Sequence, residues 1–529
     1  MPVLGICYGA QLMVYLLGGK VKRGEIREYG RALVRILRDA PLFDGLEEQE
    51  AVWMSHGDSI VELPEGFERM AESEDGITAV VKKVNAEVYG VQFHPEVSHT
   101  PKGLKIMDNF AGRIAGCPKT WTNEMEIEDA LRYIESRIGN SDAGCMWSSG
   151  VDSTVATRLV QMRYPDAFAL YVAGLDRKDD EEGARRLAKK CGIKNLVIKD
   201  ATDRFAGAVS PFRDPQKVRE AVGNVYVDVF DEVVREMGMN PEEVKFVQGT
   251  LYTDKVESGV SVDGKADNIK LHHNVGCRRV KEKDEMGLLV EPNGMVYKDG
   301  ARRRAGALGL PDEMFVKKPF PGPGLAVRMI RDLQMPEDWE DMYRKLNEIL
   351  AEYGMSGAIH PARAVGVKGD ERAYLNVAVT AGFADYGTRR AAANRVVNSI
   401  PKIGRVAHIW GRKNLDYSDQ LEFGNIKPLD FSAPNLRLLR EYDQKARNIL
   451  KETGAYDSIS QDIFVLVPGC EGPCLAVRCM KTKDYMTAEP FQFTEEQENI
   501  LSEGLLEPGE VTEVMFDFTD KPPATMEWL

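Results

Sequence analysis

A short buried strand, a loop of small hydroxylated residues and a helix follow one another directly in the middle of the chain. The apolar run 143–147 predicts the strand, and the helix continues to Arg163. Strand and helix patterns at 167–172 and 182–191 repeat the alternation. Such alternation is typical of a parallel sheet with helices on both faces. The sequence therefore predicts an α/β chain with a doubly wound parallel sheet, in which the first strand and helix are joined by Ser148-Ser149-Gly150-Val151-Asp152-Ser153-Thr154.

The loop between this strand and helix is suited to a phosphate. Its N–H and O–H donors precede a helix N-terminus, where the helix dipole favours an anion. No G-K-[ST] sequence follows, so the loop is not a Walker motif. An ordinary βα turn without a ligand is the alternative for this segment alone.

Length and composition limit the possible classes of protein. The 529 residues predict three or four domains, and 43% hydrophobic with 29% charged residues is typical of a globular chain. The net charge of −14 argues against a general nucleic-acid partner. No long apolar run predicts a membrane span or a leader, and the eight scattered cysteines favour reduced thiols. We therefore expect a cytoplasmic protein without a nucleic-acid or membrane partner.

A cysteine stands between two glycines where a strand pattern turns into a helical one. Val3 to Ile6 is the strand pattern, and the apolar helical run extends from Leu12 to Leu17. A sharp turn presents the Cys7 thiol at the sheet edge, and the N–H groups that follow can hold an oxyanion. A buried structural cysteine at a strand end is the alternative.

A base and a carboxylate for this thiol occur later in the chain. His94 ends the strand pattern 88–93, and Glu96 follows two residues on. A thiol nucleophile needs a base, and that base needs an acceptor that fixes its tautomer. Cys7, His94 and Glu96 supply these three roles.

Three segments of this region resemble the class I glutamine amidotransferases, namely 3–11, 53–58 and His94-Pro95-Glu96. The resemblance implies a flavodoxin-like domain at 1–118 that hydrolyses glutamine through a glutamyl thioester and releases ammonia. The implied site residues are catalytic Cys7, His94 and Glu96, with Tyr8, Gly9 and Gln11 in the glutamine and oxyanion pocket.

The family has several strands before its nucleophile, whereas the nucleophile strand is the first strand pattern of this sequence. A sheet without those strands exposes an apolar edge. We therefore expect a partial flavodoxin-like sheet whose first part is missing from the sequence or is supplied by a separate chain, or else an inactive glutaminase.

The hydroxylated loop resembles the S-G-G-x-D-S loop of the N-type ATP pyrophosphatases, which cleave ATP to AMP and pyrophosphate. The resemblance implies an ATP site in a domain at 119–322, with Asp152 near Mg²⁺. Two departures predict weaker nucleotide binding: Ser149 replaces the usual Gly, and the usual Asp before Gly174 is absent. The implied ATP-binding residues are Ser148, Ser149, Gly150, Val151, Asp152, Ser153 and Thr154.

Four further segments resemble the glutamine-hydrolysing GMP synthases in that family's order: 248–258, 270–275, 319–325 and 521–528. The resemblance implies amination of xanthosine monophosphate (XMP) to GMP through an adenyl-XMP intermediate. ATP, Mg²⁺, XMP and glutamine or ammonia are the implied ligands, without a prosthetic group. The alternative is a non-catalytic XMP-binding paralogue, which would explain Ser149 and Lys318, the latter in place of the family's usual His.

Three of these segments carry side chains or backbone groups that suit the reaction. Asp254 and Glu257 would share a face of a helical turn and can hold Mg²⁺ or a lid contact, with a solvated charged turn as the alternative. A mobile Lys270 can neutralise charge on the α-phosphate. Pro321-Gly322-Pro323-Gly324 exposes N–H groups, although on its own it predicts only a rigid linker.

The last third of the chain contains the same order of elements twice. A hairpin, a helix and a strand are predicted at about 360–412 and again at 460–529, within an α+β module at 323–529. In the GMP synthase family this module helps to bind XMP and mediates dimerisation. Two copies in one chain can pair with each other, so monomer and homodimer both stay open. The residues implied to bind XMP are Pro321, Gly322, Pro323, Gly324, Arg372, Lys521, Thr525 and Glu527.

Overall fold

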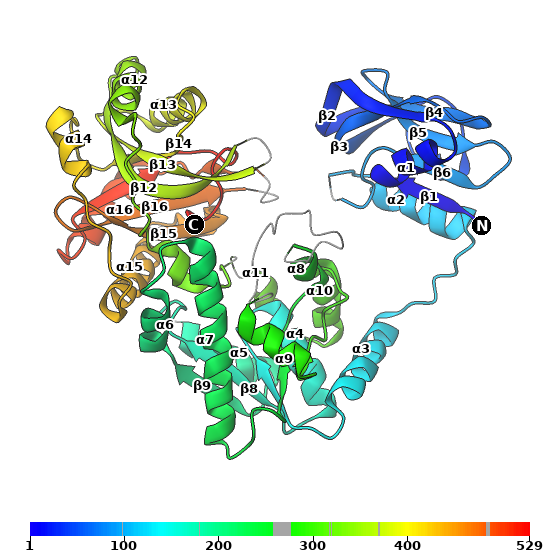
Figure 1. Cartoon of the computed structure of the whole chain (residues 1–529), viewed down its shortest axis with the longest axis horizontal. Helices are drawn as coiled ribbons and strands as arrows, with labels where there is room; N and C mark the ends of the chain where they lie inside the picture. Colours follow the sequence, from blue (N-terminus) through cyan, green and yellow to red (C-terminus); the bar gives the residue numbers. More distant parts are fainter. Residues whose placement is uncertain are drawn as a thin grey trace. The chain divides into compact units, whose positions relative to one another are not determined.

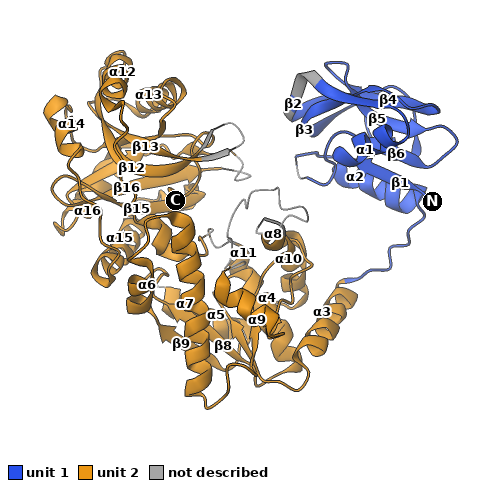
Figure 2. Cartoon of the chain, viewed as in Figure 1, with its two compact units in different colours: residues 1–122 blue, residues 123–529 orange. Residues whose placement is uncertain are grey.

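The computed structural model describes residues 1–97, 99–178, 180–257, 277–316, 318, 320–368, 371–482 and 487–529. They form two compact units, 1–122 and 123–529, which are coloured separately in Figure 2. The boundary predicted at 322/323 lies inside the second unit. The chain combines helices with strands, some of them in a parallel sheet (Figure 1), so the predicted α/β class is confirmed.

The first unit contains one six-stranded sheet and short helical segments. Its elements are β1 (Val3–Ile6), α1 (Tyr8–Leu16), β2 (Lys20–Ile36), η1 (Pro41–Phe43), β3 (Gln49–Glu62), β4 (Phe67–Ser73), β5 (Thr78–Lys83), β6 (Val88–Val91), α2 (Gly103–Asp108) and η2 (Asn109–Ile114). The strand order is β1-β6-β5-β4-β2-β3, with β1 and β6 parallel and the other neighbours antiparallel. Among the described residues β1 pairs with β6 alone, so the strand that precedes Cys7 lies at a sheet edge.

The second unit begins with a five-stranded sheet in which all neighbours run parallel, in the order β11-β10-β7-β8-β9. Its elements are α3 (Asn123–Ile138), β7 (Ala143–Met146), α4 (Val151–Arg163), β8 (Phe168–Ala173), α5 (Asp180–Cys191), β9 (Leu196–Asp200), α6 (Thr202–Val209), α7 (Pro215–Glu236), β10 (Lys245–Val247), α8 (Tyr252–Glu257), α9 (Arg278–Glu285), β11 (Leu289–Val290), α10 (Lys298–Ala307) and α11 (Glu313–Val316).

Both faces of this sheet are buried. Along β8, Phe168, Leu170 and Val172 join one apolar cluster, with α6 and α7. The alternate residues Ala169 and Tyr171 join a second cluster, with α3, α4 and α5. A strand that is apolar at every position is typical of a doubly wound sheet, which is the arrangement predicted from the sequence.

The rest of the second unit is built on a seven-stranded sheet. Its elements are η3 (Gly324–Arg328), α12 (Trp339–Ala351), β12 (Ser356–Lys368), β13 (Glu371–Ala381), α13 (Tyr386–Ser399), β14 (Ile403–Ile409), α14 (Tyr417–Phe423), α15 (Ala433–Glu452), η4 (Tyr456–Ser458), β15 (Gln461–Pro468), β16 (Pro473–Lys481), β17 (Glu489–Pro490), α16 (Glu495–Leu506) and β18 (Glu513–Asp517). The order is β12-β13-β14-β18-β16-β15, and β17 pairs with β16.

Two ββαβ units make up this sheet. In each, an antiparallel hairpin is followed by a helix and by a strand parallel to the second hairpin strand: β12, β13, α13 and β14, then β15, β16, α16 and β18. The last strands of the two units, β14 and β18, pair antiparallel in the centre. The duplicated α+β topology predicted from the sequence is therefore present, and the two copies share one sheet.

Candidate active site

Cys7 forms a sharp turn between β1 and α1. Its φ of 47° and ψ of −105° lie in a region that residues with a side chain rarely adopt. Gly5 allows the turn, since a Cβ there would lie 2.8 Å from the backbone of Gly9. The strand–turn–helix geometry expected for the nucleophile is thus formed.

The Cys7 thiol makes two weak hydrogen bonds. Sγ donates to the Ser55 carbonyl over 3.9 Å and accepts from Nε2 of Gln92 over 3.7 Å. Burial raises the pKa of the thiol and outweighs the opposing effect of the Tyr8 N–H. The thiol is therefore protonated at neutral pH and requires a base to become a nucleophile.

His94 and Glu96 form a base and acceptor pair. Nδ1 of the imidazole lies 2.7 Å from Oε1 of Glu96, which leaves Nε2 for proton transfer. The Glu96 charge also raises the pKa of Cys7, so the carboxylate acts on the thiol electrostatically. Within the described part of the chain, no hydrogen bond joins Sγ to the His94 ring.

The residues predicted for the glutamine pocket differ in their surroundings. Gln11 is buried, and its Nε2 donates to the Asp58 carbonyl at 2.8 Å and to Oε1 of Gln92 at 3.1 Å. Tyr8 is 70% exposed, whereas Gly9 is half-buried. Gln11 is therefore held by hydrogen bonds within the protein, whereas Tyr8 faces solvent.

Gln92 was missed by the sequence reasoning although it links Gln11 to Cys7. The available signal is its position two residues before His94, because side chains two apart in extended chain point to the same side.

The loop between β7 and α4 folds around the Ser153 hydroxyl. Ser148 donates its N–H to Ser153 Oγ over 3.1 Å, and the two hydroxyl oxygens lie 3.0 Å apart. The same hydroxyl reaches the Gly150 carbonyl over 3.2 Å. Gly150 is the N-cap of α4, and the N–H groups of a helix's first turn point toward the place where a phosphate would lie.

Two other loop residues are enclosed by the protein. Ser149 has a φ of 58° and is only 3% exposed, so it holds a left-handed conformation that glycine adopts without strain. Thr154 is fully buried, and its Oγ1 accepts a hydrogen bond from Nε1 of Trp147 at 2.8 Å. The Thr154 hydroxyl is thus engaged with the core, and Val151 opens α4 beside it.

The ends of two neighbouring strands pack against this loop. A Cβ at Gly249, just after β10, would lie 2.6 Å from the backbone nitrogen of Ser153. After β11, Nδ2 of Asn293 donates to the Asp152 carbonyl at 2.9 Å. Sequence reasoning grouped Gly249 with a motif but did not find this close approach, which explains why a glycine is required there.

The residues predicted to hold Mg²⁺ or a lid are only partly described. Oδ2 of Asp254 accepts the Leu251 N–H at 2.8 Å, at the start of α8. The Glu257 side chain and all of Lys270 lie outside the described residues. In the described ranges, no three His, Cys, Asp or Glu side chains are grouped for a metal. Mg²⁺ is usually held by one or two carboxylates plus substrate phosphates, which a single Asp152 in the first turn of α4 fits.

The Pro321-Gly322-Pro323-Gly324 segment contacts the loop that follows β8. Gly324 has a φ of 57°, and a Cβ there would lie 2.2 Å from the Leu175 carbonyl oxygen. The next residue, Leu325, donates its N–H to the same oxygen at 2.8 Å. The segment predicted for XMP therefore lies directly against the sheet that carries the phosphate loop.

A cluster of buried charged side chains lies next to this contact. The Phe320 ring lies between the guanidinium groups of Arg177 and Arg328, 4.6 and 5.0 Å from the ring centre. Arg177 is 5% exposed and lies 3.7 and 3.8 Å from the carboxylates of Asp443 and Asp462. Its Nε and Nη2 have no hydrogen-bond partner among the described residues.

Lys318, which stands where the resembled family usually has His, is bound by other groups of the chain. Its Nζ donates to the Tyr456 carbonyl at 2.9 Å and lies 3.4 Å from Asp462. Burial lowers the pKa of Lys318.

The C-terminal tail brings Glu527 next to η3. Its carboxylate accepts from Nη2 and Nε of Arg328 at 2.9 and 3.2 Å. The Thr525 hydroxyl is used within the tail, where it donates to the Glu527 carbonyl at 2.5 Å. The Lys521 backbone pairs with that of Ala488. Arg372 lies in β13, and its side chain is outside the described part.

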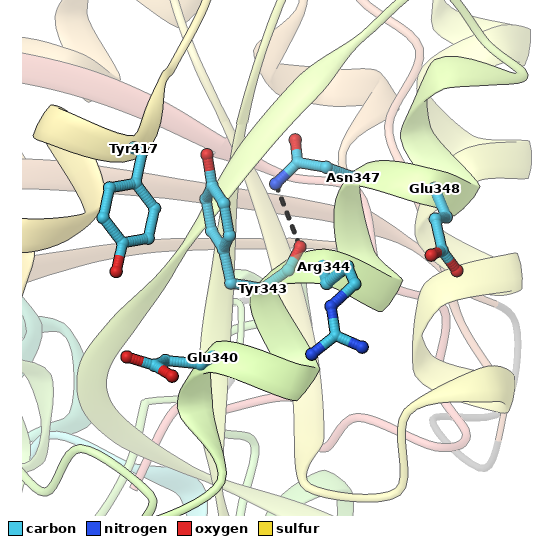
Figure 3. Close-up of a pocket in the computed structure, with 6 residues that line it drawn as sticks. All are labelled: Glu340, Tyr343, Arg344, Asn347, Glu348 and Tyr417. Carbon is cyan, nitrogen blue, oxygen red and sulfur yellow. Dashed lines mark hydrogen bonds between the residues drawn. The ribbon is translucent and has the colours of Figure 1, made fainter.

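A hollow of about 560 Å³ lies elsewhere, on α12 and α14 (Figure 3). None of the predicted site residues lines it; its walls are Glu340, Tyr343, Arg344, Asn347, Glu348 and Tyr417. No described helix is both long and apolar enough to cross a membrane.

Two family models match the chain. The model for class I glutamine amidotransferases matches residues 1–114, and the model for the GMP synthase C-terminal domain matches residues 448–528. Among solved structures, a GMP synthase subunit of Thermoplasma acidophilum is 36% identical, with a TM-score of 0.21 over 22% of this chain and 58% of that one.

Curated relatives extend over most of the chain. A glutamine-hydrolysing GMP synthase of Caldicellulosiruptor saccharolyticus is 39% identical over 77% of this chain and 83% of its own length. The enzymes of that name from Vibrio vulnificus and Thermus thermophilus are 37% and 38% identical, with 82% and 83% of their lengths covered.

Proposed function

Because the chain belongs to the family of glutamine-hydrolysing GMP synthases, we propose that it is a carbon–nitrogen ligase that aminates XMP to GMP, with AMP and pyrophosphate as the other products. The observation that carries the proposal within this chain is the contact of Gly324 and Leu325 with Leu175. It joins the segment proposed for XMP to the sheet with the phosphate loop, so that both nucleotides can meet.

The phosphate loop is proposed to hold ATP by the end that departs. N–H groups at the start of α4, with the hydroxyls of Ser148 and Ser153, would receive the pyrophosphate. Asp152 would hold Mg²⁺ together with phosphate oxygens, and the cation would neutralise charge on the leaving pyrophosphate.

Two bond exchanges complete the proposed reaction. The C2 oxygen of XMP attacks the α-phosphorus and pyrophosphate leaves, which gives adenyl-XMP. Ammonia then attacks C2, the C2–O bond breaks, and AMP leaves while nitrogen loses a proton. The Pro321-Gly322-Pro323-Gly324 segment, Lys521 and Glu527 are the proposed XMP ligands, since Lys suits a phosphate and a carboxylate suits N–H or ribose O–H groups. Arg372 and Thr525 are also proposed to bind XMP. Asp254, Glu257 and Lys270 are proposed to form the lid.

The nitrogen donor is a separate proposal. Cys7, His94 and Glu96 would release ammonia from glutamine, but Sγ bonds to Ser55 and Gln92 and, in the described part of the chain, not to the His94 ring. We therefore expect this polypeptide by itself to make GMP from ammonia and not from glutamine. Initial rates with ammonium and with glutamine decide the matter, and equal rates would refute it.

Release of pyrophosphate tests the ligase itself. Purified protein with ATP, XMP, ammonium and Mg²⁺ should release pyrophosphate and form GMP, and neither should appear when XMP is omitted. The second candidate is a non-catalytic XMP-binding paralogue, favoured by the buried, left-handed Ser149 in the phosphate loop. XMP binding without pyrophosphate release at any Mg²⁺ concentration would support this candidate.

The division into domains at 1–118, 119–322 and 323–529 stays a proposal about how these activities are distributed along the chain.

A further inference from the structure

Arg405 belongs to the first ββαβ unit, yet its guanidinium binds the tail of the second. From β14, Nη2 donates to the carbonyls of Thr525 at 3.0 Å and Glu527 at 2.5 Å, and to the Thr525 hydroxyl at 2.9 Å. It also reaches the Val365 carbonyl of β12 at 3.2 Å. The side chain is fully buried, and these bonds satisfy Nη2, whereas Nε has no hydrogen-bond partner among the described residues.

A second buried arginine holds the same stretch of tail from the other unit. Arg478 of β16 donates to the carbonyls of Thr525 at 2.9 Å and Met526 at 3.0 Å. Both guanidinium groups converge on Oδ2 of Asp517, at 3.0 Å from Arg405 and 2.8 Å from Arg478. Two buried cations beside one carboxylate are costly, and the tail carbonyl oxygens offset part of that cost by accepting hydrogen bonds from both guanidinium groups.

Arg405 and Arg328 together fix Glu527, the residue whose carboxylate is proposed to bind XMP. The backbone carbonyl of Glu527 is bound by Arg405, and its carboxylate is bound by Arg328. On the next residue, the Trp528 carbonyl accepts the Val365 N–H at 2.7 Å. The backbone and the side chain of Glu527 are therefore both held. The first ββαβ unit supplies hydrogen bonds to the backbone of both Glu527 and Trp528.

We propose that Arg405 is a positioning residue for the acceptor nucleotide, acting through the tail backbone. The first ββαβ unit thereby takes part in substrate binding without touching the substrate. The inference rests on the proposed function, because it requires Glu527 to contact XMP.

The matched control is Arg331, a buried arginine that binds three backbone carbonyls away from the tail. Its guanidinium donates to the carbonyls of Val209, Ser210 and Phe212. R331Q removes three bonds to backbone carbonyls from a buried site, whereas R405Q also removes the ion pair with Asp517, so R405Q should lower the unfolding temperature more.

Binding of XMP by titration calorimetry, and KM values for XMP and ATP, then separate positioning from stability. We expect R405Q to weaken XMP binding and raise the KM for XMP by about tenfold or more, with the KM for ATP within about twofold of wild type. R405K should fall between, since an ammonium group keeps one bond, and R331Q should leave XMP binding unchanged.

The inference is overturned if R405Q binds XMP as wild type does, or if R331Q weakens XMP binding equally. Should R405Q fail to fold, the comparison of R405K with R331K decides by the same criteria. If the wild-type protein binds no XMP, the proposed function is overturned as well. If the wild type binds XMP and the Arg405 variants bind it equally well, only this inference is overturned.

Discussion

The guanidinium of Arg328 binds the carboxylate of Glu527 through two hydrogen bonds, from Nη2 to Oε1 at 2.9 Å and from Nε to Oε2 at 3.2 Å. Arg328 is fully buried, and its Nη1 lies 3.4 Å from a second carboxylate, that of Asp443. A forked pair of this kind fixes direction as well as distance. The orientation of the proposed XMP ligand thus depends on a residue of η3.

Replacement of Arg328 tests this dependence. R328M leaves the Glu527 carboxylate without its buried partner, whereas Asp443 keeps Arg447 at 2.5 Å, so we expect the free energy of unfolding to fall by about 3–5 kcal/mol. The double variant R328M/E527M removes the stranded charge and should be more stable than R328M. Urea unfolding of the three proteins measures both effects. A double variant less stable than R328M would contradict the account.

Replacement of Gly324 by Ala tests the contact between the two loops. The new Cβ would overlap the Leu175 carbonyl oxygen at 2.2 Å, and the residue would keep a φ of 57°. We expect a loss of about 2 kcal/mol or more in stability, with a marked loss of XMP-dependent pyrophosphate release. Gly309 offers a control, since its φ is 65° and nothing lies within 4 Å of its Cβ position among the described residues. If G309A impairs pyrophosphate release as much as G324A does, the contact is not the cause.

Replacement of Ser149 by Gly should relieve the phosphate loop. The φ of 58° costs a serine more than a glycine, so we expect S149G to raise the free energy of unfolding by about 0.5–1 kcal/mol. Removal of a buried side chain next to the loop should also lower the KM for ATP. Asn195 has a φ of 51° outside the loop, so N195G serves as the control for backbone strain. An ATP KM that rises in S149G would show that the serine helps to bind ATP.

Stability should fall on acidification because of His360. Burial lowers its pKa from 6.5 to about 4, and Nδ1 accepts the Ala362 N–H while Nε2 lies 2.9 Å from the Pro468 carbonyl. The folded state therefore keeps this histidine neutral, whereas the unfolded state protonates it below pH 6.5. Its contribution is intact above that pH and is lost between pH 6.5 and about 4, at about 1.4 kcal/mol per pH unit.

Urea unfolding at several pH values measures the slope. H360Q has no titrating group and should show a shallower fall between pH 6.5 and 4 than wild type. An unchanged slope would assign the acid sensitivity to other groups, of which His408, with a pKa lowered to about 3 by burial, is the first to consider.

Local patterns were sufficient to predict much of the fold. The strand pattern at 167–172 predicted a parallel strand of a doubly wound sheet, and the two faces of β8 do lie in separate apolar clusters. The turn at Cys7 followed from the glycine pattern around it, and the structure shows a close backbone approach that requires glycine at Gly5. The repeated order of elements predicted two ββαβ units.

Contacts between distant segments could not be predicted in the same way. Nothing local to Arg405 indicates a bond to Glu527, which is 122 residues away. Thr154 was predicted to be a loop hydroxyl, yet its partner is Trp147 in the core. The sheet within residues 1–122 is also mainly antiparallel. This is an outcome of strand pairing, which residue periodicity does not encode.

The central pairing of β14 with β18 has a consequence for how this chain can change in evolution. Ala407 and Ile409 belong to the same apolar cluster as Trp528. Arg405, two residues before Ala407, lies on the same side of β14, whereas Val406 joins the cluster on the opposite side. An inserted or deleted residue within β14 would therefore send Arg405 to the wrong side and release the tail. Length variation among descendants should accumulate in the helical connection around α15 and be purged from the two central strands.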